Sequence, residues 1–132
     1  WQHVIELIYG YLKLAEELKK NKSIHGESFN FGPNNQKTRK VKEILNEIKK
    51  QWKGFRWKEN SKKKLKESKL LKLNCNKSKR KLKWKIAMNF QETIKLTLDW
   101  YKKYYSSFSK KRKFIYKLSS NQIKSYEKKF IL

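Results

Sequence analysis

The side chains that could do acid-base, metal or nucleophilic chemistry are few in this sequence and are scattered along it. His3, His25 and Cys75 are the soft ligand candidates, and they share no metal-ligand spacing. We expect His25 in a loop and Cys75 as a small buried apolar group. Asp99 is the only aspartate, and the surrounding helical pattern predicts that it faces solvent instead of completing a Ser-His-Asp triad. The residues therefore predict neither a metal site nor a catalytic group.

A glycine-rich loop that cradles phosphate groups is also missing. Dinucleotide-binding and P-loop motifs need several glycines close together at the start of a helix. The four glycines of this chain are too far apart for either motif. We therefore expect that these residues alone hold neither NAD nor ATP in the usual way. The glycines are Gly10, Gly26, Gly32 and Gly54.

Positive charge is the strongest feature of the composition. The 132 residues include 36 Lys and Arg against 11 Asp and Glu, a formal net charge of +25, which suggests a polyanionic partner. Only four of the basic residues are arginine, although base reading and bidentate phosphate binding favour the planar guanidinium. Residues with A/T-rich codons, such as Asn and Ile, are in excess, so our hypothesis is that genome composition explains much of the lysine. We interpret the basic run at residues 110–113 as a solvated linker.

A small nucleic-acid-binding module is the rival interpretation from another functional class. Its mark would be a basic stripe on one face with exposed aromatic side chains beside it. Aromatic residues make up 14% of the chain, and their spacing predicts inward positions on helices. We therefore expect no nucleic acid as a partner.

Cysteine usage and hydropathy bear on the compartment. A single cysteine excludes an internal disulfide and agrees with a reducing cytoplasm. No apolar run approaches the roughly 18 residues of a membrane span, and the chain starts at Trp1 with neither an initiator methionine nor a signal-peptide pattern. We therefore expect a cytoplasmic chain without a membrane partner that begins within a larger protein.

The elements that must position any site are predicted by periodicity. Apolar residues recur at helical spacing over residues 4–18, 41–52 and 90–105, and more weakly over residues 114–132. Thr38 is the expected N-cap of the second helix, and Asn74 or Asn76 is the expected cap of a short helix. Residues 27–33, 55–57 and 70–73 have the composition of short strands.

This order of helices and strands predicts an α/β fragment with a core on the inward positions of the periodic segments. The expected core residues are Val4, Ile8, Leu12, Phe29, Phe31, Ile44, Ile48, Leu73, Trp84, Ile94 and Leu98.

Several stretches, taken in order, are similar to the motifs of one enzyme family. The opening Trp-Gln-His-Val at residues 1–4 is similar to that family's Arg-Pro-Trp-Gln-His-Val-Leu-Glu, and it continues into Gly-Tyr-Leu-Lys-Leu-Ala-Glu at residues 10–16. Residues 26–33, Gly-Glu-Ser-Phe-Asn-Phe-Gly-Pro, are similar to Gly-Glu-Ala-Phe-Asn-Phe-Gly-Pro. In these stretches the chain resembles the CDP-glucose 4,6-dehydratases, a branch of the extended short-chain dehydrogenase/reductase family, and the opening motif is the most specific match.

The resemblance continues to the end of the chain. Residues 67–74 resemble the family's Glu-Ala-x-x-Leu-Lys-Leu-Asp, residues 97–101 its Thr-x-x-Trp-Tyr, and residues 118–126 its Leu-Thr-x-x-Gln-Ile-x-x-Tyr. Lys77, Leu82 and Trp84 lie at the positions of matching motif residues between them. Departures occur where the family has His, Asp and Gly, and the residues there are Lys66, Asn74 and Lys83.

The resemblance implies the C-terminal part of an extended short-chain dehydrogenase/reductase, of class α/β. Residues 1–33 would complete and pack on the Rossmann-like dinucleotide-binding domain, residues 34–105 would form the smaller sugar-nucleotide-binding lobe, and residues 106–132 would be a linker and a helical tail. NAD and the catalytic residues would belong to an N-terminal half outside this chain. The complete enzyme is expected to be a homo-oligomer.

The resemblance also implies the substrate and its contacts. The ligand would be a nucleotide sugar, CDP-glucose, which the complete enzyme converts to its 4-keto-6-deoxy product. The implied substrate-binding residues are Trp1, Gln2, His3 and Glu67, and the first three would lie at the end of a strand, where open α/β sheets bind ligands. A related epimerase or a dehydratase acting on another nucleotide remains open, because the same lobe would serve it.

Overall fold

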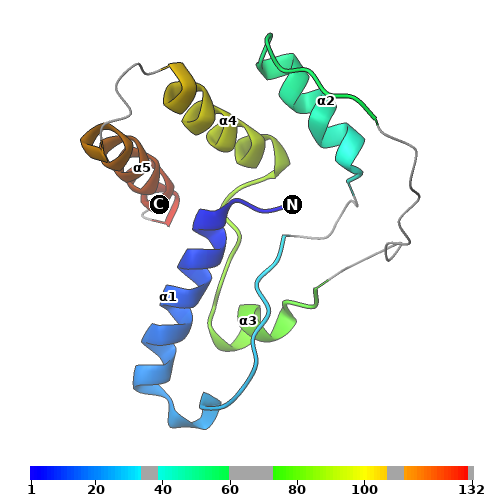
Figure 1. The fold of residues 1–132 in the computed structure, drawn as a ribbon. Coiled ribbons are helices and arrows are strands. Elements are labelled where there is room, and N and C mark those ends of the chain that lie inside the picture. Colours follow the sequence, from blue (N-terminus) through cyan, green and yellow to red (C-terminus); the bar gives the residue numbers. More distant parts are fainter. Residues whose placement is uncertain (34–38, 60–72, 107–111, 131–132) are drawn as a thin grey trace.

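The structure is a computed structural model that describes residues 1–33, 39–59, 73–106 and 112–130, and in these ranges its regular structure is all helical (Figure 1). In the picture α5 follows α4 and runs back, so that its C-terminal end lies beside α1. The elements are α1 (Val4–Lys20), η1 (Lys22–Ile24), α2 (Val41–Gln51), α3 (Asn76–Lys81), α4 (Phe90–Ser106), α5 (Arg112–Glu127) and η2 (Lys128–Phe130).

The α/β prediction, with last elements of a Rossmann-like domain, is therefore wrong for the described residues. Residues 27–33, 55–57 and 73 form no strand there, and residues 70–72 lie outside the described ranges. Short apolar segments favour extended chain, but a strand also needs a neighbouring backbone to pair its N–H and C=O groups. Segment 27–33 is held by side chains instead, since the Asn30 carbonyl accepts a hydrogen bond from the Ser78 hydroxyl.

The predicted helices are confirmed, and their starts follow local capping. His3 caps α1, because its Nδ1 accepts from the Ile5 N–H at 3.2 Å. At the start of α2 the Glu43 carboxylate accepts from the Lys40 N–H at 2.7 Å, whereas the expected cap Thr38 lies outside the described residues. The N-cap of α3 is Cys75, without a side-chain cap hydrogen bond, so neither Asn74 nor Asn76 is the cap residue as expected. Asn74 Oδ1 still accepts from the Asn76 N–H at 3.0 Å.

The first hydrophobic cluster, which we call the α1 cluster, joins the inner face of α1 to the segments that flank α3. Trp84 is 0% exposed, and its ring packs edge-on against Phe31 with 5.3 Å between centroids. Tyr9 of α1 stacks on Phe130 at 4.4 Å, which brings η2 to the same helix. The buried members are Ile24, Phe31, Cys75, Leu82 and Trp84. Cys75 is thus buried as expected.

The second cluster, the α2–α4 cluster, is a contact between two amphipathic helices. Partly buried side chains from both helices surround it, and Trp52 closes the end of α2. α5 adds to α4 through two hydrogen bonds, one from Trp100 Nε1 to Ser119 Oγ at 3.1 Å and one from Gln122 Nε2 to the Leu96 carbonyl at 2.7 Å. The buried members of the cluster are Ile44, Ile94 and Leu98.

The expected core is only partly correct, and α1 accounts for most of the errors. Leu12 is 64% exposed, and the aromatic rings of Tyr101 and Tyr105 on α4 are exposed as well, against the expectation that aromatics point inward. Expected core residues that are buried are Phe31, Ile44, Trp84, Ile94 and Leu98. Phe29 and Ile48 are partly buried. Those that are exposed are Val4, Ile8, Leu12 and Leu73.

α1 buries the face opposite to the predicted one, because the Phe31 ring packs closely against the helix backbone at Gly10. A Cβ added there would lie 2.5 Å from Phe31 Cδ1, so only glycine lets the ring reach the helix backbone. The face that contains Gly10 and Glu6 consequently turns inward. The opposite apolar stripe, Val4, Ile8, Tyr11 and Leu12, is left in solvent.

No helix within the described ranges is both long and apolar enough to cross a membrane.

Candidate functional site

The three expected ligand-binding residues at the N-terminus lie together at the start of α1 and differ in their surroundings. Trp1 is 60% exposed. His3 is half-buried, caps the helix, and has a pKa below its usual value because burial disfavours the imidazolium. Gln2 Nε2 is buried, and no described residue accepts a hydrogen bond from it. Glu67 lies outside the described residues, so its position relative to the other three stays a prediction.

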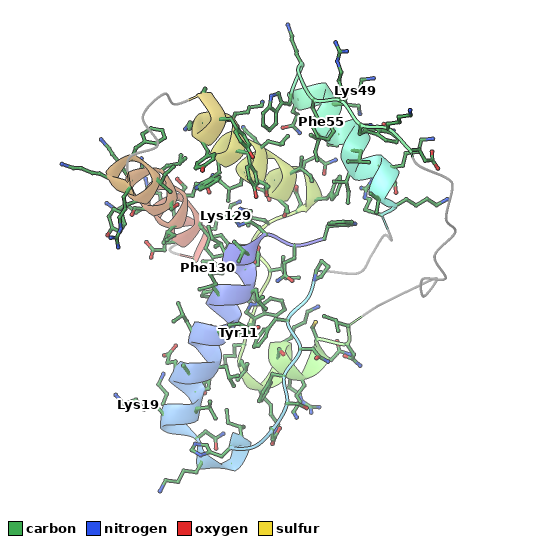
Figure 2. The ribbon with its side chains drawn as sticks, in the orientation of Figure 1. Tyr11, Lys19, Lys49, Phe55, Lys129 and Phe130 are labelled. Atoms are coloured by element: carbon green, nitrogen blue, oxygen red, sulfur yellow. The ribbon has the colours of Figure 1, made fainter. Side chains whose placement is uncertain are left out.

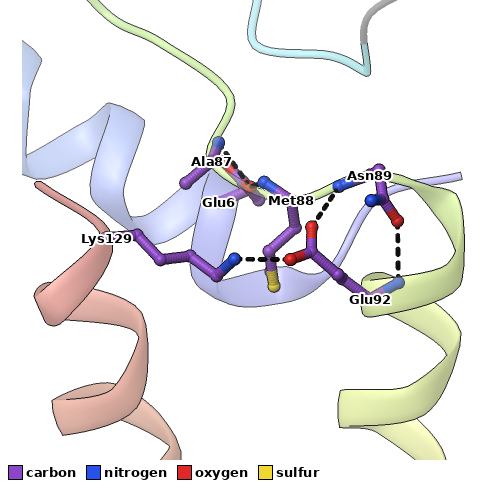
Figure 3. A network of polar contacts seen from close by, with 6 residues as sticks. All are labelled: Glu6, Ala87, Met88, Asn89, Glu92 and Lys129. Carbon is purple, nitrogen blue, oxygen red and sulfur yellow. Dashed lines mark hydrogen bonds and ion pairs between the residues drawn. The ribbon is translucent and has the colours of Figure 1, made fainter.

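Near the start of α1, the side chain of Glu6 is only 1% exposed. It contacts the segment before α4, as Figure 3 shows, and also α5. Its Oε1 accepts from the backbone N–H groups of Ala87 at 3.0 Å and Met88 at 2.8 Å. Its Oε2 accepts from the Tyr126 hydroxyl at 2.9 Å. One carboxylate therefore ties α1 both to the segment before α4 and to α5.

The electrostatics of this junction follow from burial. Desolvation raises the pKa of Glu6 above its usual value, although the hydrogen bonds from Tyr126, Met88 and Ala87 and the charge of Lys129 act in the opposite direction. Burial and the Glu6 carboxylate both raise the pKa of Tyr126. The phenol therefore keeps its proton and remains the donor.

Beside this junction, Glu92 organises the start of α4. Its Oε2 accepts from the Asn89 N–H at 2.8 Å while Asn89 Oδ1 accepts from the Glu92 N–H at 3.0 Å, a reciprocal cap. Its Oε1 binds Lys129 Nζ at 2.6 Å (Figure 3). The hydrogen bonds from Lys129 and Asn89 hold the pKa of Glu92 below its usual value.

A cavity of about 180 Å³ lies between α4 and α5 next to these groups. Pockets for drug-sized ligands are typically about 300–1,000 Å³, so this cavity is too small for a nucleotide sugar. Because Glu6 is enclosed and both of its oxygens accept hydrogen bonds, its chemistry is structural. The cavity is lined by Met88, Glu92, Lys95, Leu96, Asp99, Ser125, Tyr126 and Lys129.

A second polar junction holds segment 27–33 against α3. Glu27 binds Lys77 Nζ at 2.8 Å and Lys81 Nζ at 2.6 Å, and these ammonium groups hold the pKa of Glu27 below its usual value. Lys77 Nζ also lies 4.9 Å from the centre of the Phe29 ring. Asn30 Nδ2 donates to the Asn74 carbonyl at 3.3 Å. This segment is therefore fixed by charge and side-chain contacts on one face of α3.

Glu6 was missed by the sequence analysis because a charged residue near a helix start is usually exposed. A sequence signal for the burial of Glu6 was present, because Glu6 lies one helical turn before Gly10 and therefore on the same face of α1. Metal binding is not supported in the described residues, which contain no group of three or more His, Cys, Asp or Glu side chains able to hold an ion. His25 lies after η1, exposed, with Nε2 2.8 Å from the Leu18 carbonyl.

No protein-family model and no solved structure matches the chain. The CDP-glucose 4,6-dehydratase of Salmonella typhimurium (strain LT2) is 29% identical over 103 residues, which cover 77% of this chain and 29% of the relative. The chain thus spans less than a third of that protein's length. The similarity supports a relationship to dehydratases of this kind.

Proposed function

We propose that this chain is the substrate-binding portion of an NAD-dependent dehydratase that converts CDP-glucose to CDP-4-keto-6-deoxyglucose. The observation that carries the proposal is the 29% identity with a CDP-glucose 4,6-dehydratase over 103 residues. A related nucleotide-sugar dehydratase or epimerase is the alternative, because the residues that would separate the two reactions lie outside this chain.

The contacts between the family-like motifs support this proposal. Glu6, directly after the opening Trp-Gln-His-Val-Ile, hydrogen-bonds Tyr126 of the closing motif. Glu27 of the Gly-Glu-Ser-Phe-Asn-Phe-Gly-Pro stretch binds Lys77, and Phe31 packs on Trp84. Residues that recur in a dehydratase pattern therefore hold one another in place, which explains why these residue types occur together.

The exposed stripe of α1 supports a larger assembly. Val4, Ile8, Tyr11 and Leu12 are all about half exposed or more, on one face of one helix. A contiguous apolar face of this kind typically packs on another domain or protein. In the proposed enzyme it packs on the NAD-binding portion.

NAD does not fit the described residues. Its pyrophosphate needs a cradle of backbone N–H groups at a helix start, whereas Gly10 faces Phe31 and Gly32 faces Leu73. The proposal therefore assigns cofactor binding to residues outside this chain. It expects no turnover by this chain alone.

Trp1, Gln2 and His3 are the proposed substrate contacts, with Glu67 as a fourth. The exposed Trp1 ring offers an apolar surface, and Gln2 Nε2 is a buried donor without a partner among the described residues. An unpaired buried donor costs about 1–3 kcal/mol, which a ligand oxygen would offset. Burial keeps His3 neutral at pH 7, because its pKa is lowered.

The test uses the full-length protein that contains this chain. Incubation with CDP-glucose should yield a nucleotide sugar lighter by one water, detected by mass spectrometry, while UDP-glucose and GDP-mannose should react at least about tenfold more slowly. Absence of turnover with all three nucleotide sugars would contradict the proposal. Equal or faster reaction with another nucleotide would favour the alternative.

The contact residues are tested in the same assay. Gln2→Ala and Glu67→Ala should each raise KM for CDP-glucose several-fold, because each removes a group proposed to touch the ligand. The matched control is Gln91→Ala, which removes an exposed amide on α4. If neither Gln2→Ala nor Glu67→Ala changes KM, the contact assignment is wrong even where the enzyme turns over.

A further inference from the structure

A second hollow, which we call the α2-end hollow, lies where α2 ends and the chain turns back along it. Its volume is about 440 Å³, within the usual range of about 300–1,000 Å³ for small-ligand pockets. Figure 2 labels Lys49 and Phe55 there, at the end of the molecule away from Lys19 of α1. The lining residues are Asn46, Lys49, Lys53, Phe55, Arg56 and Trp57.

The charge of the hollow has one sign. Lys49, Lys53 and Arg56 contribute three cations to its lining, and no carboxylate lines it among the residues that the structure describes. Within the described part of the chain none of these three side chains makes an ion pair, although half of the acidic residues there do. Three cations held around one concave surface attract a multiply charged anion more strongly than the same charges spread over a helix.

The aromatic lining narrows the kind of anion. Phe55 and Trp57 are both partly buried, so each ring still presents surface to the hollow. Aromatic faces bind the π-face of a nucleobase with little preference among bases, and Arg56 adds a planar donor that matches phosphate oxygens. Asn46 is the one amide side chain that lines the hollow in the described ranges, so we expect the site to discriminate only weakly between nucleobases.

From this combination of three unpaired cations and two aromatic rings around a concave surface, we infer that the α2-end hollow binds a nucleoside diphosphate. The phosphates contact Lys49, Lys53 and Arg56, and the base packs on Trp57 or Phe55. Trp1, Gln2 and His3 are not among the described lining residues of this site. It does not depend on the proposed dehydratase activity.

The experiment measures binding of CDP, ADP and inorganic pyrophosphate to the full-length protein by equilibrium dialysis, at physiological salt. CDP and ADP should bind with Kd values within about threefold of each other, and pyrophosphate at least about tenfold more weakly. The double variant Lys53→Ala/Arg56→Ala should raise Kd for ADP at least about tenfold. Because CDP is part of the proposed substrate and ADP is part of NAD, only the binding that the Lys53→Ala/Arg56→Ala variant removes is assigned to the α2-end hollow.

The matched control is Lys19→Ala/Lys117→Ala, which removes two exposed lysines from α1 and α5 and changes the net charge by the same amount. Its Kd for ADP should change less than about threefold. Equal weakening by both double variants would show diffuse surface charge and overturn the site. Pyrophosphate binding as tight as ADP would overturn the role of the aromatic rings.

Two further measurements complete the test. Trp57→Leu keeps an apolar side chain but removes the indole ring. It should raise Kd for ADP at least about threefold and leave Kd for pyrophosphate unchanged. Loss of affinity for both ligands, with an unchanged circular dichroism spectrum, would contradict the stacking of the base on Trp57. A single-stranded oligonucleotide that binds more tightly than ADP, with affinity rising with its length, would show a nucleic-acid surface instead. Absence of ADP binding to the unsubstituted protein, together with intact CDP-glucose turnover, would overturn this inference and leave the proposed function standing.

Discussion

The α1 cluster and the α2–α4 cluster are both apolar, but they are built in different ways. The α2–α4 cluster joins two helices that each have one apolar face. The α1 cluster joins a helix to irregular segments around α3, and its centre is the Phe31–Trp84 contact. Periodicity predicted the buried residues of the α2–α4 cluster, but it did not predict which face of α1 packs in the α1 cluster.

This difference shows where a hydrophobic pattern is sufficient. α2 has charged residues on all but one face, so only one orientation buries its apolar side chains. α1 has two apolar stripes, one with Leu7, Leu14 and Leu18 and one with Ile8 and Leu12. Burial energy alone does not choose between two such stripes, so close packing at Gly10 and the hydrogen bonds to Glu6 decide.

The largest expected effect is at the centre of the α1 cluster. Trp84→Ala should lower the free energy of unfolding by about 3–5 kcal/mol, because it leaves a large cavity at a fully buried site. Ile94→Ala in the α2–α4 cluster should cost about 2–4 kcal/mol. Urea unfolding followed by circular dichroism measures both. A smaller loss for Trp84→Ala than for Ile94→Ala would reverse the comparison.

Glu6→Ala should cost about 2–4 kcal/mol, because the N–H groups of Ala87 and Met88 and the Tyr126 hydroxyl lose their acceptor. Glu6→Gln is the matched control. Its amide oxygen can accept from both backbone donors and its amide nitrogen can donate to the phenol, so we expect a change below about 1 kcal/mol. Thermal unfolding separates the two variants, and equal losses would mean that charge, not hydrogen bonding, holds the junction.

Gly10→Ala should destabilise the chain by about 1–2 kcal/mol. Alanine gains about 1 kcal/mol of helix propensity over glycine, but the added methyl would lie 2.5 Å from Phe31 Cδ1 and must displace the ring. The control Gly10→Ala/Phe31→Leu opens space for the methyl and should recover part of the loss in a double-mutant cycle. A stabilised single variant would show that the approach to Phe31 does not choose the buried face of α1.

A pH series sharpens the role of Glu6 further. Burial raises its folded-state pKa, so wild-type stability from this group is full below the unfolded pKa and falls as pH rises through the raised folded value. Glu6→Gln has no such loss. The stability of Glu6→Gln relative to wild type should therefore increase from acidic to neutral pH, and a decrease would mean that the hydrogen bonds outweigh desolvation. Glu27 and Glu92 have lowered pKa values and act in the opposite direction, equally in both proteins.

The smallest effect is expected on the exposed stripe of α1. Leu12→Lys should change the stability of this chain by less than about 0.5 kcal/mol, because the side chain is largely in solvent. Leu14→Lys, on the inner face, should cost about 2 kcal/mol or more because it buries a charge. In the full-length protein, Leu12→Lys should also lower the free energy of unfolding, because the proposed NAD-binding portion covers the stripe. An unchanged free energy of unfolding there would contradict this packing.

The helices could be predicted from sequence because their signals are local. Periodic apolar residues mark α1, α2 and α4, and polar caps mark helix starts. The strand predictions were wrong because composition alone does not supply a partner strand. Residues 27–33 and 55–57 have strand-like composition but no described backbone partner. Of the candidate site, residues 1–3 were predicted by resemblance and stay a prediction, whereas the α2-end hollow was missed because Lys49 and Trp57 are brought together only by the turn after α2.

The sequence by itself determined the helices, the buried face of α2 and the buried Ile94 and Leu98 of α4, since these follow from apolar residues spaced three or four positions apart. Only the tertiary structure decided which stripe of α1 is buried, because that choice depends on Phe31 and on backbone donors some eighty positions away at Ala87 and Met88. It also decided that Glu6 is a buried acceptor. A carboxylate near a helix start is tolerated in a core only where distant donors replace its water, and no local pattern specifies those donors.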